Sequence, residues 1–273
     1  MVAVDIDGTL LDSSWQLPEE NRTAIEEAVA CGIEVALVTG RRYEFTREVL
    51  HLLPCPLTAI VNNGALVKRS DGTTAWRRML PRATARRVLE ATRDYRDGAG
   101  VIFDRPRDGQ VVFERIDWSH PSRAGYAHRN RSFVTEIAPL EEALTEDPIQ
   151  VMFNGRVEPM RTLAAQLRGS QESGEYSVSV TEYQDRDFSL VDVLGPDCTK
   201  GRTLLEWAGR QGYRREELLA IGDNLNDLEM LEAAGTAVVM GNAVAELRDR
   251  GWAVTASADE AGVGKAIRRW ALS

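Results

Sequence analysis

Two acidic residues near the start of the chain have the spacing that catalysis or metal binding needs. Asp5 and Asp7 lie in residues 4–9, which read VDIDGT. Side chains alternate between the faces of a strand, so both carboxylates point the same way if the strand continues through them. Neighbouring carboxylates repel each other, and a bound cation or a shared proton relieves this repulsion. A pair of solvated turn acids before Gly8 is the simpler alternative, and the pair alone does not decide between them.

Three further segments carry polar residues where a strand-like apolar run ends or a helix is expected to begin. Thr39 offers a hydroxyl, and Gly40 lets a backbone N–H approach a ligand closely. Lys200 precedes a glycine at the start of an expected helix, and this order does not match a Walker-type phosphate loop. Its ammonium lies either in water or in a cluster of carboxylates and phosphate. Residues 222–227 (GDNLND) hold two Asp and two Asn, more than a helix N-cap requires. Such oxygen donors suit Mg²⁺.

The elements that must position these residues alternate between strand and helix in the first third of the chain and again after residue 190. This alternation predicts a parallel sheet with right-handed crossovers. Ligands bind such sheets outside the carboxyl ends of the strands, so we expect the polar residues to gather there. Strands are expected at 1–4, 33–38, 57–61, 217–221 and 236–240, and helices from Pro18 to about Gly32, at 41–53, 200–211, 225–234 and 260–270.

The middle of the chain has a different pattern. Residues 65–77 fit a hairpin around Asp71-Gly72, and residues 81–185 mix helices with strands that do not alternate regularly. We therefore predict an α/β fold with a Rossmann-like parallel-sheet core, residues 1–80 and 186–273, and an inserted α+β domain, residues 81–185. Within the insertion, an aromatic and arginine-rich stretch from Trp118 to His128 fits either a pocket for a sugar or second anion, or a solvated loop.

Composition narrows the possible partners and location. Hydrophobic residues make up 43% and charged residues 27%, as in soluble globular proteins. The net charge of −9 disfavours nucleic acid and anionic membrane surfaces as partners. No apolar stretch approaches a membrane span, and the first residues do not form a signal peptide. The three cysteines show neither metal spacing nor a disulfide framework, so we expect a cytoplasmic protein.

Taken in order, the motifs resemble the haloacid-dehalogenase-like (HAD) hydrolase superfamily over about residues 1–80 and 186–273. The position and length of the insertion resemble the large α/β cap of its Cof-type subgroup, which is class IIB-like. The matching motifs are Asp5 to Asp12 (DIDGTLLD), Thr39-Gly40-Arg41, Asn63-Gly64-Ala65, Lys200-Gly201, residues 222–227 and Gly241-Asn242-Ala243.

This resemblance implies a phosphatase that uses Mg²⁺ to hydrolyse small phosphorylated metabolites, such as sugar phosphates or phosphorylated cofactors. Asp5 would be the nucleophile that forms an aspartyl-phosphate. Asp7 would protonate the leaving alcohol and then take a proton from water. The implied metal ligands are Asp5, Asp223 and the backbone carbonyl of Asp7.

The resemblance also implies the groups that bind phosphate. Thr39, the Gly40 N–H, Lys200 and Asn226 would hold the non-bridging oxygens, where transition-state charge is spread. Asp227 would orient Lys200 or a water molecule bound to the metal.

Two other functions remain open at this point. A phosphomutase or phosphotransferase of the same superfamily shares the core chemistry, so the motifs do not separate it from a phosphatase. A non-catalytic, phospho-accepting module similar to a response-regulator receiver also places acids, a hydroxyl and a lysine at strand ends. Such receivers lack an inserted second domain and have no use for an acid at Asp7.

Overall fold

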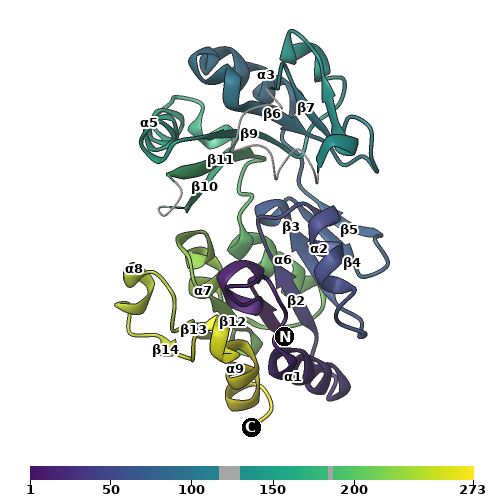
Figure 1. Cartoon of the computed structure of the whole chain (residues 1–273), viewed down its shortest axis with the longest axis vertical. Helices are drawn as coiled ribbons and strands as arrows, with labels where there is room; N and C mark the ends of the chain where they lie inside the picture. Colours follow the sequence, from purple (N-terminus) through teal and green to yellow (C-terminus); the bar gives the residue numbers. More distant parts are fainter. Residues whose placement is uncertain (117–129, 184–186) are drawn as a thin grey trace. The chain divides into compact units, whose positions relative to one another are not determined.

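The computed structural model describes residues 1–116, 130–183 and 187–273. The chain divides into two compact units (Figure 1). Unit 1 contains residues 1–77 and 198–273, and unit 2 contains residues 78–197. The stretch from Trp118 to His128 lies outside the described residues.

Unit 1 is built on an eight-stranded sheet. Neighbours are parallel from β14 through β3, whereas β4 and β5 are added antiparallel at one edge. The strand order is β14 (Ala253–Val254), β13 (Thr236–Val239), β12 (Leu219–Gly222), β1 (Val2–Val4), β2 (Val35–Val38), β3 (Thr58–Val61), β4 (Leu66–Arg69) and β5 (Thr74–Arg77).

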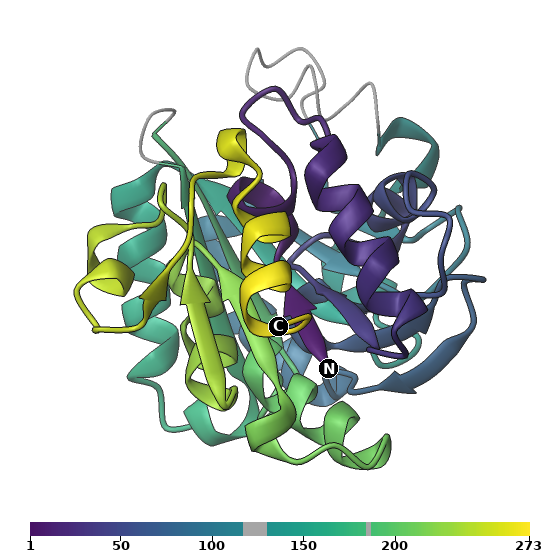
Figure 2. The same ribbon diagram turned by 90° about the horizontal axis from the view of Figure 1, so that it is seen from below.

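The central strands are short apolar runs that are buried along their whole length. Val35–Val38 reads VALV and Thr58–Val61 reads TAIV, which is typical of parallel strands covered on both faces. Helix α1 packs against α9, as Figure 2 shows, and α6 packs against α7. The helices of unit 1 are α1 (Glu19–Ala30), α2 (Tyr43–Leu50), α6 (Lys200–Arg210), α7 (Leu228–Ala233), α8 (Ala245–Arg248) and α9 (Gly262–Trp270).

The strand order places a topological switch point at β1. Val4 of β1 pairs with Leu37 of β2 on one side and with Ile221 of β12 on the other. The chain leaves β1 toward β2 and β3, and the C-terminal strands continue the sheet from β12 in the opposite direction. The segments that follow β1 and β12 therefore meet at one crevice, where ligands bind in open sheets of this kind.

Unit 2 has its own sheet and core. Its helices α3 (Arg82–Ala91) and α5 (Val157–Arg168) pack on the sheet around buried side chains such as Leu89, Phe153 and Leu163. All neighbouring strands are antiparallel except β7 and β8. The strand order is β10 (Ser177–Tyr183), β11 (Phe188–Leu194), β9 (Gln150–Gly155), β6 (Ala99–Ile102), β7 (Val111–Phe113) and β8 (Val134–Glu136).

The predicted fold class is confirmed, with a difference at each end of the insertion. Residues 78–80 and 187–197 were expected in the core, but the structure assigns both segments to unit 2. For residues 187–197 the reason is that β11 pairs along its length with both β10 and β9, so it completes the second sheet. Among the described residues, no helix is both long and apolar enough to cross a membrane.

Candidate active site

The first acidic motif is a tight turn and does not continue strand β1. Residues 6–10 turn directly after Asp5, and the N–H of Leu10 donates to the carbonyl of Asp5 at 3.2 Å. Gly8 has φ +78°, which favours glycine, and a Cβ there would lie 2.5 Å from Oδ2 of Asp223. Because the strand ends before Asp5, the strand alternation considered for Asp5 and Asp7 does not apply, and the two carboxylates bind different partners.

Asp5 belongs to a buried group of charges with Lys200 and Asp227. The Lys200 Nζ donates to Oδ1 of Asp5 and to Oδ1 of Asp227, both at 2.6 Å. Lys200 is 2% exposed, Asp5 4% and Asp227 not at all. A cation in the first turn of α6 is opposed by the helix dipole, so the two carboxylates must stabilise it.

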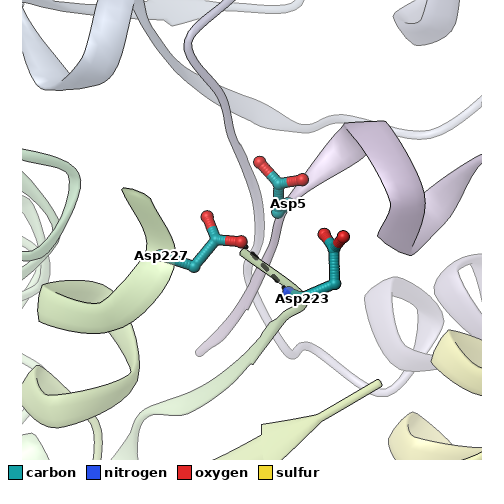
Figure 3. Close-up of side chains that lie close together, drawn as sticks. All are labelled: Asp5, Asp223 and Asp227. Atoms are coloured by element: carbon teal, nitrogen blue, oxygen red, sulfur yellow. Dashed lines mark hydrogen bonds between the residues drawn. The ribbon is translucent and has the colours of Figure 1, made fainter. Parts of the chain in front are cut away.

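The loop after β12 brings a third carboxylate to the same place. Asp227 accepts hydrogen bonds from the backbone N–H groups of Asp223 and Asn224 through Oδ2, both at 3.1 Å. Asp223 in turn accepts a hydrogen bond from the Thr9 hydroxyl at 2.8 Å. Figure 3 shows the side chains of Asp5, Asp223 and Asp227 lying close together. A hydrogen bond between side chains thus links the segment after β1 to the segment after β12.

Burial and crowding make this cluster electrostatically unfavourable as it stands. Burial, and then the neighbouring Asp227, raise the pKa of Asp5 well above its ordinary value. The same two causes raise the pKa of Asp223 to about 7. Burial alone would lower the pKa of Lys200, but Asp227 and Asp5 raise it above the ordinary lysine value. When all are ionised, three carboxylates share one ammonium, and two negative charges remain uncompensated.

This donor set fits a divalent cation that prefers oxygen ligands. Asp5, Asp223 and Asp227 each offer a carboxylate oxygen, and these oxygens lie within 4.8 Å of one another. Hard carboxylate donors and excess negative charge are what Mg²⁺ requires. Two members of the expected metal set, Asp5 and Asp223, are therefore in the cluster. The Asp7 carboxylate is not in this three-residue group.

Asp7 is instead paired with Arg41, a residue for which no role was predicted. The Arg41 Nε donates to Oδ2 of Asp7 at 2.9 Å, and a terminal guanidinium nitrogen donates to Oδ1 at 2.5 Å. This two-point contact fixes the plane of the carboxylate. The only sequence signal for it was that Arg41 directly follows the Thr39-Gly40 motif.

The expected phosphate-binding residues lie at the same edge of the sheet. Thr39 is buried just beyond β2, and its hydroxyl accepts a hydrogen bond from the Arg41 N–H at 3.1 Å. A Cβ on Gly40 would lie 2.9 Å from Oδ1 of Asn63, so the glycine is needed for this close packing. Asn226 is half-buried in the turn Leu225–Asp227 that follows β12.

Asn242 is a second contributor to the site that was noted only as part of a motif. Its Nδ2 donates to the carbonyl of Gly8, and its Oδ1 accepts from the N–H of Ala258, both at 2.8 Å. The side chain thus links the turn after Asp5 to the segment before α9. Its place in a Gly-Asn-Ala motif was the available signal.

The fold and the site together define an α/β protein with a buried carboxylate and lysine cluster at the switch point of its sheet. A sequence profile of the haloacid dehalogenase-like hydrolase family matches residues 2–267, and the chain belongs to this family. The predicted resemblance to the HAD superfamily and its Cof-type subgroup is confirmed.

Two relatives illustrate the match in sequence. "Phosphatase YwpJ" of Bacillus subtilis (strain 168) is 26% identical, and the alignment covers 98% of each chain. "Pyridoxal phosphate phosphatase YbhA" of Escherichia coli (strain K12) is 27% identical over 89% of this chain and 88% of the relative. These matches confirm the expected enzyme class, a phosphomonoester hydrolase of the HAD type.

Solved structures agree with this fold over the whole chain. A haloacid dehalogenase-like hydrolase from B. subtilis superimposes with a TM-score of 0.82 at 23% identity, covering 98% of this chain and 99% of the other. The HAD subclass IIB sugar phosphatase BT4131 gives a TM-score of 0.77 at 20% identity, covering 100% and 99%. At these identities the likeness establishes the fold.

Proposed function

We propose that this enzyme is a Mg²⁺-dependent phosphatase that hydrolyses small-molecule phosphate monoesters through an aspartyl-phosphate on Asp5. The observation that supports this most strongly is the carboxylate cluster, in which Asp5 and Asp227 both bind Lys200 and an oxygen of Asp223 lies within 4.8 Å of theirs. It unites a nucleophile, oxygen donors and a fixed cation. The phosphatases among the relatives of the chain are consistent with it.

Asp5 carries the covalent step. A carboxylate oxygen of Asp5 attacks phosphorus and forms a P–O bond, while the bond from phosphorus to the ester oxygen breaks and the alcohol leaves. The contact from Lys200 orients this carboxylate within the buried cluster. Asp5, Asp223 and the backbone carbonyl of Asp7 would hold the cation. Mg²⁺, when bound, offsets the repulsion between the attacking carboxylate and the anionic phosphate.

Asp7 acts as the general acid and then as the general base. An aliphatic alkoxide is a poor leaving group, so Asp7, protonated and with one oxygen released from Arg41, gives a proton to the ester oxygen as the bond breaks. In the second half of the reaction Asp7 takes a proton from the water that attacks the aspartyl-phosphate. Proton transfer of this kind typically contributes about 10²–10⁴-fold to the rate.

Four groups bind the non-bridging oxygens of the phosphate, where negative charge is spread in the transition state. They are the hydroxyl of Thr39, the N–H of Gly40, the ammonium of Lys200 and the side-chain amide of Asn226. Asp227 keeps Lys200 in place, since one of its oxygens accepts a hydrogen bond from Nζ while the other binds the loop after β12.

Phosphate release from a panel of sugar phosphates and phosphorylated cofactors, with Mg²⁺ or with a chelator, tests the proposal. We expect metal-dependent turnover that Asp5→Asn abolishes, and that Asp249→Asn, an exposed acid at the end of α8, leaves intact. Turnover that persists in Asp5→Asn, or no turnover of any ester by the folded wild type, would overturn it. Conversion of a hexose phosphate to its isomer without free phosphate would instead identify a mutase.

A further inference from the structure

Trp15 is a large aromatic side chain whose position the hydrophobic core does not explain. Its side chain is 53% exposed, although most large apolar residues of unit 1 are buried. Its backbone has φ +62°, in the left-handed region that bulky residues rarely adopt. An exposed indole on an unfavourable backbone has a cost in stability, and such strain persists where the surrounding structure enforces it.

The loop around Trp15 enforces this conformation. The side-chain Oδ1 of Asp12 accepts hydrogen bonds from the backbone N–H groups of Ser14 at 2.9 Å and Gln16 at 2.8 Å. The N–H of Trp15 donates to the carbonyl of Asp12 at 3.0 Å, and the N–H of Ser13 donates to Asp259 at 2.7 Å. The indole is therefore presented by a closed turn with fixed ends.

The indole lies beside the residue that holds the candidate acid. The guanidinium carbon of Arg41 is 5.5 Å from the centre of the Trp15 ring. The same guanidinium donates hydrogen bonds to both carboxylate oxygens of Asp7. Asp7, Arg41 and Trp15 thus form a continuous row, with Arg41 in contact with both of the others. All three belong to unit 1.

The direction of this row matters for the substrate. An acid that protonates the leaving oxygen must lie within hydrogen-bond reach of it. The alcohol part of the ester therefore leaves on the Asp7 side, next to Arg41 and Trp15. A flat ring on that alcohol would cover the exposed indole, whereas a short open chain would not reach it.

We infer that Trp15, supported by Arg41, is a specificity-determining residue that stacks on a ring carried by the leaving alcohol. This inference rests on the proposed phosphatase function and gives one residue of that same site a role. Trp15 favours esters whose alcohol carries a flat ring over esters of open-chain alcohols.

Two esters with similar alcohol leaving groups test the inference, namely benzyl phosphate and ethyl phosphate. We expect Trp15→Ala to lower kcat/KM for benzyl phosphate about tenfold, as for the loss of one aromatic stacking contact. The loss on ethyl phosphate should stay below about twofold, since that ester has no ring to stack. Trp15→Phe should recover most of the benzyl phosphate activity.

A matched control is available at the opposite edge of the sheet. Trp252 also has an arginine over its ring, with 5.6 Å from Arg250 to the ring centre, and it precedes β14 rather than following a strand. Trp252→Ala should affect both esters equally. Equal losses on the two esters for Trp15→Ala would overturn the inference while leaving the phosphatase function intact. If the wild type hydrolyses neither of these esters and no ester of the wider panel, the proposed phosphatase function itself is overturned.

Discussion

Replacing Lys200 with methionine would expose how strongly the buried carboxylates depend on this one cation. The ammonium contacts Asp5 and Asp227 at 2.6 Å, and all three side chains are almost completely buried. Methionine keeps the length and most of the volume of lysine, so packing changes little. What is lost is the charge that compensates the two carboxylates.

The expected cost follows from the burial of the partners. Removing one member of a buried ion pair destabilises a protein by about 3–5 kcal/mol, because the remaining charge has no compensation. We expect this loss in the metal-free enzyme near pH 7.5. The folded-state pKa of Asp5 is already raised by burial and that of Asp223 to about 7. The folded state therefore binds more protons than the unfolded state, and stability falls as pH rises from about 4 to 7.

Lys200→Met should steepen this dependence, because the pKa of Asp5 rises further without its cation. The destabilisation should accordingly shrink when the pH is lowered to 5, where the orphaned carboxylates take up protons.

Urea unfolding followed by tryptophan fluorescence suits the test. Five of the six tryptophans lie in unit 1, so their emission follows the unit that contains the site. Lys265→Met, at an exposed position of α9, is the matched control and should change stability by less than about 0.5 kcal/mol. Equal stability of Lys200→Met and wild type at pH 7.5, or a loss that does not vary with pH, would refute this reasoning.

Two further predictions concern the metal and the turn after Asp5. Because burial and Asp227 raise the pKa of Asp223 to about 7, Mg²⁺ must displace protons, and its affinity should fall up to about tenfold between pH 7 and pH 6. Titration calorimetry in two buffers of different ionisation enthalpy measures both quantities, and a pH-independent affinity without proton release would contradict the prediction. Gly8→Ala should weaken Mg²⁺ binding and destabilise the fold by more than about 1–2 kcal/mol, since a Cβ meets Asp223 at 2.5 Å on a left-handed backbone. Gly32 also has a left-handed backbone, with φ +81°, but no atom lies within 4 Å of a Cβ built there. Gly32→Ala therefore introduces backbone strain without a clash and should leave Mg²⁺ binding unchanged in the same calorimetric assay.

The parallel core followed from the sequence because its strands are continuous apolar runs at regular intervals. The four-residue segments VALV and TAIV are buried throughout, and this pattern distinguishes them from half-exposed strands. Elements such as α8 and β14 were missed, since four and two residues do not complete a recognisable period. The assignment of β11 to unit 2 depends on long-range pairing with β9 and β10, which local pattern does not encode.

Much of the carboxylate cluster could also be anticipated. Asp5 and Lys200 are 195 residues apart in sequence, yet they meet as expected from the rule that strand ends share one edge of a parallel sheet. Asp223 and Asp227 were likewise expected there.

The partner of Asp7 could not be anticipated in the same way. The direction of the Asp7 side chain depends on the left-handed turn at Gly8, and the alternation of side chains along a strand does not describe this turn. Arg41 and Trp15 approach one another only through the turn closed by Asp12, so neither was assigned a role from the sequence.

A single turnover in ¹⁸O-labelled water is the most direct test of the central claim, which is nucleophilic attack by Asp5. The enzyme is in excess over an ester that it hydrolyses, and Mg²⁺ is present. The water that cleaves the aspartyl-phosphate attacks either phosphorus or the acyl carbon of Asp5. Attack on the acyl carbon leaves ¹⁸O in Asp5 and none in the first phosphate released. Attack on phosphorus leaves ¹⁸O in phosphate, so acid-quenched enzyme is examined in parallel for a phosphorylated peptide containing Asp5. We expect this peptide in wild type and not in Asp5→Asn. Labelled phosphate released at full rate with no modified Asp5 peptide at any time would show direct attack by water and rule out Asp5 as the nucleophile.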